Sequence, residues 1–231
     1  MLQKEDHKKT KRVAVIVAHP DDETLWVGGA MLLLPALQWF TLCLCRASDE
    51  NRAPRFYETL KILHSEGVMG DLDDGPEQTP LDDKLVEQTI LDLLPPKHYD
   101  LLITHNPSGE CTRHVRHEET GKAVIRLWHD GKISASQLWV FAYEDSNKKY
   151  YPKPIANAAI FQKLPNKIWQ KKYCIITETY GFEKDSFEAK ITPRAEAFWR
   201  FTNSQEAVDW LNSCPQAIGA MNNGFLDTAC T

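Results

Sequence analysis

The chain has 231 residues, of which 42% are hydrophobic and 26% are charged, and its formal net charge is −5. This length suits one large α/β domain, and a negative charge without long runs of one sign argues against a general nucleic-acid surface. No stretch approaches the roughly 20 apolar residues that a membrane-spanning helix needs. The basic leader from Lys4 to Arg12 lacks the apolar run of a signal peptide. The six cysteines form no Cys-x-x-Cys pair, which favours a cytoplasmic compartment.

Apolar strand patterns and amphipathic helix patterns alternate along the first part of the chain. Strands are predicted at residues 13–17, 40–47, 68–72, 99–104 and 137–143, and helices at 25–34, 56–66, 81–94 and 118–129. This alternation is typical of a Rossmann-like, mostly parallel sheet with helices on both faces in a single α/β domain. The alternation ends after Glu144. A helix is predicted at 166–179, although residues 175–177 would also suit a strand.

The most informative stretch is residues 18–23, Ala-His-Pro-Asp-Asp-Glu, directly after the first predicted strand. In an open α/β sheet this turn lies at the carboxyl end of a strand, where ligands bind. Buried carboxylates are costly unless another charge offsets them, and a divalent cation is the simplest candidate. His19 and Asp22 can both face one point in a tight turn, which leaves Asp21 free for acid/base chemistry. The alternative, a helix N-cap, needs only one acid and does not explain His19.

This hexapeptide resembles the first signature of the LmbE-like (PIG-L) zinc-dependent de-N-acetylases. Their second signature, His-x-x-His on a later loop, is similar to residues 114–117, His-Val-Arg-His, after the strand predicted at 99–104. The resemblance covers about residues 13–201, the expected deacetylase domain, and leaves residues 1–12 and 222–231 as flexible termini. It implies a Rossmann-like fold and a bound Zn²⁺ ion, with Fe²⁺ as an alternative because His/carboxylate sites accept either metal.

The resemblance also implies roles for the residues of both signatures. His19, Asp22 and His117 would be the metal ligands, and a catalytic zinc with one open position would activate water and polarise a carbonyl. Asp21 would be the general base, with a residue that only orients the site as the alternative. His114 would stabilise the oxyanion, with a partly exposed loop histidine as the alternative. His105 is the next histidine to consider, since it ends a predicted strand beside the site.

Three further residues are expected to bind substrate. Arg55 and Glu58 match an Arg-x-x-Glu of the family, with a surface ion pair as the alternative. Asp74 precedes a glycine, as in a pocket-lining Asp-Gly of the family, with a simple turn as the alternative. Arg116 stands where the family often has Asp or Asn. If Arg116 faced His114 it would disfavour the imidazolium, whereas an outward Arg116 would bind an anionic substrate group. We favour the outward orientation, because adjacent side chains in a helical turn do not face each other.

These observations predict a metal-dependent hydrolase that removes an acetyl group from an N-acetylated amino sugar or a similar small acetamide, a linear amide. One alternative is a metal-dependent phosphohydrolase or nucleotide-binding protein, but no Gly-rich phosphate motif follows the first strand. Another is a non-catalytic carbohydrate-binding protein of the same fold. The expected partner is a small N-acetylated substrate, with no nucleic acid and no membrane-spanning segment, and the sequence is compatible with a homo-oligomer.

Overall fold

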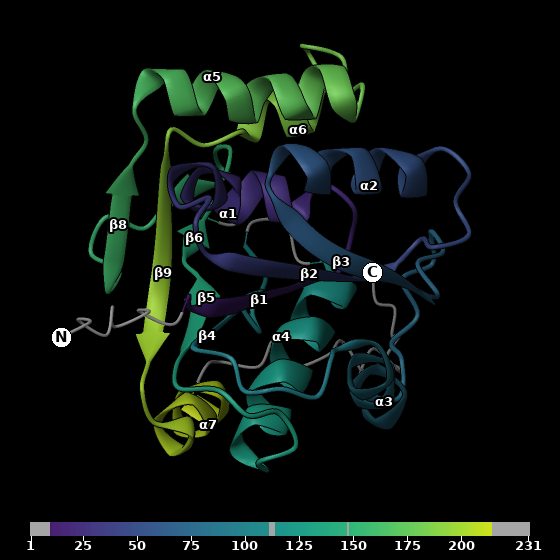
Figure 1. The fold of residues 1–231 in the computed structure, drawn as a ribbon, viewed down its shortest axis with the longest axis vertical. Coiled ribbons are helices and arrows are strands. Elements are labelled where there is room, and N and C mark those ends of the chain that lie inside the picture. Colours follow the sequence, from purple (N-terminus) through teal and green to yellow (C-terminus); the bar gives the residue numbers. More distant parts are fainter. Residues whose placement is uncertain (1–9, 111–113, 147, 214–231) are drawn as a thin grey trace, which may run out of the picture.

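The computed structural model describes residues 10–110, 114–146 and 148–213. These residues form a seven-stranded sheet with the strand order β3-β2-β1-β4-β5-β9-β8 (Figure 1). The neighbours from β3 to β5 are parallel, whereas β9 runs antiparallel to β5 and β8 runs antiparallel to β9. This mostly parallel sheet confirms the predicted α/β fold class.

The sheet consists of strands with the following bounds: β1 (Arg12–Val17), β2 (Gln38–Cys45), β3 (Ser65–Leu72), β4 (Leu101–Thr104), β5 (Leu138–Phe141), β8 (Ile160–Lys163) and β9 (Ala195–Phe201). A separate antiparallel pair contains β6 (Tyr143–Glu144) and β7 (Lys153–Pro154). The helices are α1 (Asp22–Leu33), α2 (Arg52–Ile62), α3 (Asp83–Leu93), α4 (Val115–His129), α5 (Asn166–Cys174), α6 (Phe187–Ile191) and α7 (Ser204–Ser213). The π-helical segment η1 (Ile175–Thr179) continues α5.

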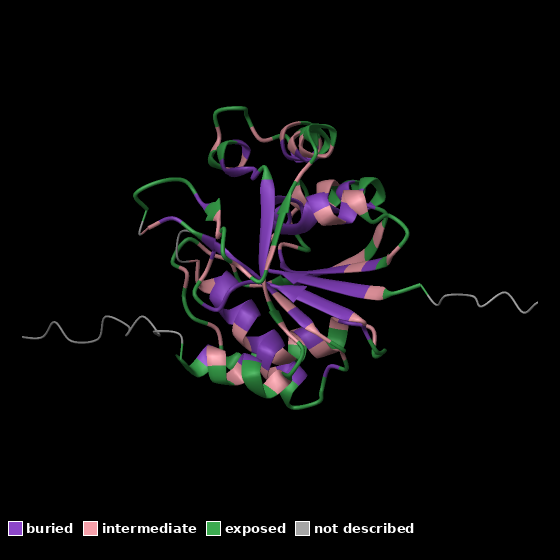
Figure 2. Ribbon diagram, turned by 90° about the vertical axis from the view of Figure 1, so that its left-hand side faces the viewer, coloured by how far each residue is buried: buried purple, intermediate pink, exposed green. Residues whose placement is uncertain are grey.

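Two hydrophobic cores lie on the two faces of the sheet. Helices α1, α2, α5 and α6 cover one face and α3, α4 and α7 cover the other (Figure 1). Along β1, Val15 and Val17 pack into the first core, and Ala14 and Ile16 pack into the second. Strands buried on both faces need apolar residues at every position, which explains the unbroken apolar run of β1. Figure 2 shows the strands as a buried layer between helices whose outer faces are exposed.

The C-terminal part of the fold differs from the sequence prediction. The segment 166–179 is helical throughout, so the strand alternative for residues 175–177 is wrong. Helix α7 lies beyond residue 201, the predicted end of the domain, and buries Ala207 and Leu211 in the second core. The termini predicted to be flexible, residues 222–231 and most of 1–12, lie outside the described residues, but Arg12 already belongs to β1. No helix in the described ranges is long and apolar enough to cross a membrane.

The order of the strands determines where a ligand can bind. The chain runs from β1 outward through β2 to β3, and then returns to add β4 on the other side of β1. Ligands of open α/β sheets bind at the carboxyl ends of the strands where the order reverses in this way. The two loops at this point are the β1–α1 turn and the β4–α4 connection, which carry the two sequence signatures.

Candidate active site

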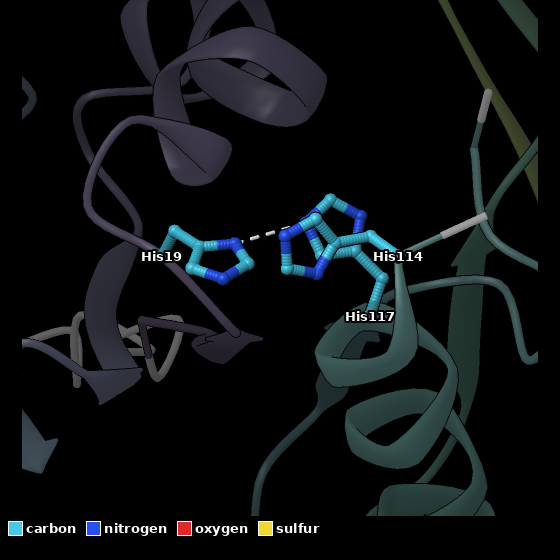
Figure 3. Close-up of side chains that lie close together, drawn as sticks. All are labelled: His19, His114 and His117. Atoms are coloured by element: carbon cyan, nitrogen blue, oxygen red, sulfur yellow. Dashed lines mark hydrogen bonds between the residues drawn. The ribbon is translucent and has the colours of Figure 1, made fainter. Parts of the chain in front are cut away.

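A pocket of about 450 Å³ opens at this edge of the sheet. Ligand pockets in proteins typically span about 300–1,000 Å³. Its walls include six of the eight predicted site residues, namely His19, Asp21, Asp22, Asp74, His114 and His117. The two signatures are therefore brought together, as predicted, although they lie about 90 residues apart in the sequence. His19 extends from the turn before α1, and His114 and His117 extend from the start of α4 (Figure 3).

Three ligand atoms converge on one point in this pocket. His19 Nδ1 lies 3.0 Å from His117 Nε2 and 3.2 Å from Asp22 Oδ2. His117 Nε2 lies 3.3 Å from the same carboxylate oxygen. The Asp22 carboxylate is held in place, since Oδ2 also accepts the His19 backbone N–H at 2.9 Å and Oδ1 accepts the Trp26 indole N–H at 3.0 Å. The cluster is therefore fixed before anything binds to it.

Hydrogen-bond partners determine which nitrogen of each histidine is free. His19 Nε2 lies 3.1 Å from Asp74 Oδ1, and His117 Nδ1 lies 2.7 Å from Glu110 Oε2. An ionised carboxylate only accepts hydrogen bonds, so both of these nitrogens carry protons and donate them. In the neutral rings, the opposite nitrogens therefore present lone pairs toward each other and toward Asp22. Such a cluster of electron-rich atoms is repulsive unless a cation lies among them.

The donor set fits a divalent metal ion. A tetrahedral zinc with bonds of about 2.0–2.1 Å has ligand atoms about 3.3–3.4 Å apart. The separations of 3.0, 3.2 and 3.3 Å among His19, Asp22 and His117 are close to this spacing. Two imidazoles and one carboxylate are also a donor set that catalytic zinc sites use, with one coordination position left for water or substrate. Without a metal, Asp22 and Glu110 outweigh burial and raise the pKa of His117 well above its ordinary value. A proton on His117 and a metal ion therefore compete for the same place.

Asp21 has an unusual backbone conformation beside this cluster. Its φ of 123° and ψ of −27° lie in a region that residues other than glycine rarely adopt. The buried Glu23 carboxylate accepts the Asp21 backbone N–H at 3.2 Å, and Tyr180 donates its hydroxyl to the same carboxylate at 2.8 Å. Burial and the neighbouring Asp22 raise the pKa of Asp21 well above its ordinary value, while Arg52 at 3.5 Å opposes them. A carboxylate with a raised pKa at a pocket wall is suited to proton transfer near neutral pH.

His114 is the N-cap residue of α4, and its ring lies against the rings of His19 and His117. Ring centroids are 4.4 Å from His19 and 4.9 Å from His117. Its buried Nδ1 has no hydrogen-bond partner among the described residues. Burial, followed by the two neighbouring histidines, lowers the pKa of His114 to about 4. The ring is therefore neutral near pH 7 and can donate one N–H, which differs from the imidazolium considered in the sequence analysis.

Asp74 lies in the pocket wall, but its carboxylate mainly contacts other protein groups. Besides His19, it accepts the Arg46 guanidinium at 2.6 and 2.9 Å and the Gln78 amide at 3.2 Å. Burial alone would raise the pKa of Asp74, but the hydrogen bonds from His19, Gln78 and Arg46 hold it well below its ordinary value. Asp74 is thus a permanent anion that fixes the orientation of the His19 ring.

Arg116 does not reach the pocket. Its side chain is 1% exposed and donates to the Glu119 carboxylate at 2.6 Å and to the carbonyl of Thr79 at 2.7 Å. A third hydrogen bond, to the carbonyl of Asp73, completes the attachment of loop 73–81 to α4. These contacts correct the expectation of a substrate-binding Arg116, because the guanidinium neither faces His114 nor points outward to solvent.

Arg55 is also directed away from the pocket. It donates to the backbone carbonyl of Tyr180 and so joins α2 to the end of η1. Arg52, one helical turn earlier, lines the pocket instead. The sequence analysis placed the start of this helix at residue 56, whereas α2 begins at Arg52. The guanidinium of Arg52 lies 4.4 Å above the Phe182 ring, which holds it in place beside Asp21.

Sequence reasoning also missed Glu110, which is fully buried between His105 and His117. His105 was recognised as a candidate because of its place at the end of a predicted strand, and it directly follows β4, but its role was not predicted. The signal for Glu110 was weak, because a single acid in a polar loop is ordinary. Only the folded loop shows that this carboxylate points inward to two histidines.

No family model matches the chain. A relative from Acanthamoeba polyphaga mimivirus, the uncharacterized protein L374, is 25% identical over 175 residues, covering 69% of this chain and 74% of the relative. The N,N'-diacetylchitobiose deacetylase from Pyrococcus horikoshii superimposes on 84% of this chain and 85% of its own, with a TM-score of 0.62 and 15% identity. The zinc-inhibited form of the teicoplanin deacetylase Orf2 covers 82% of this chain and 97% of its own, with a TM-score of 0.56 and 11% identity.

The chain has the fold of the LmbE-like (PIG-L) deacetylases. The LmbE-like fold also hosts another reaction, since GalB, the 4-carboxy-2-hydroxymuconate hydratase from Pseudomonas putida, aligns with a TM-score of 0.56 at 14% identity. Identities this low establish the fold alone. The activity of this chain therefore depends on the residues of its own site and does not follow from the fold.

Proposed function

We propose that the chain is a metal-dependent N-deacetylase that hydrolyses the acetamide of an amino sugar or a similar small molecule. The observation that carries this proposal is the convergence of His19 Nδ1, Asp22 Oδ2 and His117 Nε2 within 3.3 Å of one another, beside the Asp21 carboxylate. Zn²⁺ or Fe²⁺ would be held by these three residues. When bound, such an ion supplies Lewis-acid polarisation of the acetyl carbonyl and makes water more acidic.

The other pocket residues supply proton transfer and orientation. Asp21 takes a proton from the attacking water and returns it to the departing amine, a role that its raised pKa supports. Neutral His114 donates its N–H toward the acetyl oxygen as negative charge develops there. Arg52, which lines the pocket and is held over Phe182, is placed to donate hydrogen bonds to substrate hydroxyls.

Part of the pocket lining is apolar and suits the carbon face of a sugar ring or an apolar group attached to it. Leu25, Phe187 and Ile191 form this part. Pocket charges also favour a neutral substrate, since the four acids Asp21, Asp22, Asp74 and Glu188 are offset by two arginines and a divalent ion. We place the activity in the cytoplasm, where the free thiols of Cys43, Cys45 and Cys174 would remain reduced.

The test is acetate release from N-acetylglucosamine and N,N'-diacetylchitobiose by the full chain, measured after metal removal and again after reloading with Zn²⁺ or Fe²⁺. We expect release that needs the metal and is lost in Asp21→Asn. A metal-loaded, folded protein that releases no acetate from these or other N-acetylated sugars would contradict the proposal. Hydration of an unsaturated hydroxy acid in the same preparation would assign the site to the chemistry of GalB instead.

A further inference from the structure

A network of buried groups connects the two histidine ligands behind the pocket. We infer that the relay formed by Ala18, His105, Glu110 and His117 holds the two ligands at their metal-binding distance, and that Glu110 is its central positioning residue. This inference rests on the metal site of the proposed function but not on any particular reaction. It concerns groups that do not line the pocket, apart from His117 itself.

The contacts of the relay run from the end of β1 to the first turn of α4. The Ala18 backbone N–H donates to His105 Nε2 at 3.0 Å, immediately before the ligand His19. His105 Nδ1 lies 3.0 Å from Glu110 Oε2, at an angle that gives no regular hydrogen bond, and the same oxygen accepts His117 Nδ1–H at 2.7 Å. His105 and Glu110 are both completely buried. Water therefore cannot replace either partner.

The direction of the first hydrogen bond settles the role of His105. An amide N–H can donate only to a lone pair, so Nε2 of His105 is unprotonated and its proton lies on Nδ1, facing Glu110. His105 Nε2 lies 3.3 Å from Asp22 Oδ2, and Asp22, His105 and His117 are close enough to resemble a second metal cluster. Because the lone pair of Nε2 already accepts the Ala18 amide, His105 is a support for the relay rather than a ligand.

Glu110 is held so that it can only act on its two histidines. Its second oxygen, Oε1, accepts the Asn106 backbone N–H at 2.7 Å, which fixes the carboxylate in the β4–α4 connection. Its Oε2 accepts the His117 Nδ1–H at 2.7 Å, which holds the proton of His117 on Nδ1 and leaves Nε2 free to bind a cation. Without Glu110, the His117 ring can rotate or change tautomer.

Metal affinity is the measurement that tests the relay. The Kd for Zn²⁺, from competition with a chelating dye, and the visible absorption spectrum after Co²⁺ loading would be compared for wild type, Glu110→Ala and Glu110→Gln. Loss of an outer carboxylate typically weakens metal binding about 10- to 100-fold. We expect that loss in Glu110→Ala and a smaller loss in Glu110→Gln, whose amide oxygen still accepts the His117 N–H. The Co²⁺ spectrum should change in parallel with the Kd. If Glu110→Ala does not fold, the near-isosteric Glu110→Gln still provides the measurement.

A matched control is Glu196→Gln, at another fully buried carboxylate. Glu196 accepts Lys172 at 2.6 Å and the Gly29 amide at 2.7 Å, and none of its described partners is a ligand. We expect this variant to lower the melting temperature of the metal-free protein while its Zn²⁺ Kd stays at the wild-type value. An equal loss of affinity in Glu196→Gln would show that loss of stability, not positioning, weakens the site.

Two other outcomes overturn different claims. Wild-type Kd and an unchanged Co²⁺ spectrum in Glu110→Ala would overturn the relay and leave the metal site intact. A wild-type protein that binds no divalent metal would overturn the metal site and the proposed function together. A double-mutant cycle adds a further check, because His105→Gln in the Glu110→Ala background should cost little more if the two residues act as a unit.

Discussion

The two walls of the pocket are built in different ways. One wall holds the proposed metal ligands His19, Asp22 and His117 together with Asp74, and we call it the metal wall. It lies at the ends of parallel strands and is fixed by buried hydrogen bonds. The apolar wall comes largely from α6, a helix of five residues whose Phe187 is 43% exposed. The groups that need exact geometry thus lie in short turns, loops and helix starts at the ends of the sheet strands, where buried hydrogen bonds hold them. Groups that select a substrate lie on a less firmly held element.

Removal of any one ligand in the metal wall should have the largest effect. We expect His19→Ala, Asp22→Ala and His117→Ala each to lose the single divalent metal per chain and with it all measurable acetate release, because three protein ligands are the minimum for a catalytic site of this type. Elemental analysis of the purified variants would measure this. Wild-type metal content in all three would refute the ligand set.

Replacement of the proposed base should be the next largest effect. Asp21→Asn keeps nearly the same shape but cannot accept a proton, so we expect kcat to fall about 10²- to 10⁴-fold. Metal content should remain at the wild-type level, which separates this variant from the ligand variants. A metal-loaded Asp21→Asn protein within a few-fold of wild-type turnover would show that another group is the base.

The variant Arg116→Ala tests whether Arg116 contributes to stability or to substrate binding. Arg116→Ala leaves the Glu119 carboxylate and two loop carbonyls without their donor, and breaking a buried pair typically costs about 3–5 kcal/mol of stability. We expect the free energy of unfolding to fall by about that amount in urea titrations. KM for neutral substrates should change little at temperatures where the variant is folded. A large rise in KM for anionic substrates alone would restore the substrate-binding role.

The variant Phe187→Ala tests the apolar wall, and we expect it to have the smallest effect on the kinetics. Truncation in Phe187→Ala removes an aromatic contact worth about 0.5–1.5 kcal/mol, so KM should rise about 2- to 10-fold with kcat nearly unchanged. Steady-state kinetics with a sugar that carries an apolar group would measure it. Tyr151→Ala is a control, since this ring lies 6.0 Å from Phe187 but does not line the pocket. A fall in kcat with KM unchanged in Phe187→Ala would contradict the assignment of substrate selection to the apolar wall.

The sequence predicted the parts of the site that depend on local rules. His19, Asp21 and Asp22 lie within four residues of one another, so one strand-to-turn pattern placed all three. His117 followed because parallel strands end at a common edge. The failures arose where distant partners decide the outcome. Whether Arg116 points to solvent depends on carbonyls of loop 73–81, which helix periodicity cannot show.

The other errors of the sequence prediction have similar causes. Arg55 was expected in the pocket because Arg55 and Glu58 match the Arg-x-x-Glu of the family, but Arg55 contacts the Tyr180 carbonyl and Arg52, one helical turn earlier, lines the pocket. Glu110 was missed because its partners, His105 and His117, are brought to it only by the folded loop. The C-terminal antiparallel strands carried no alternation that could be extended from the first half of the fold, so their order could not be derived.

The hydrogen bond from Tyr180 to Glu23 links the start of the chain to a residue made much later. Glu23 in turn holds the backbone of Asp21 at its positive φ. During synthesis, residues up to His117 emerge from the ribosome well before residue 180, but a domain generally folds as a unit. The support of the first signature is therefore complete only when the part of the domain that carries Tyr180 has been made, because Tyr180 supplies the hydroxyl that Glu23 accepts. Folding of the C-terminal part of the domain thus also fixes the surroundings of Asp21, the proposed base.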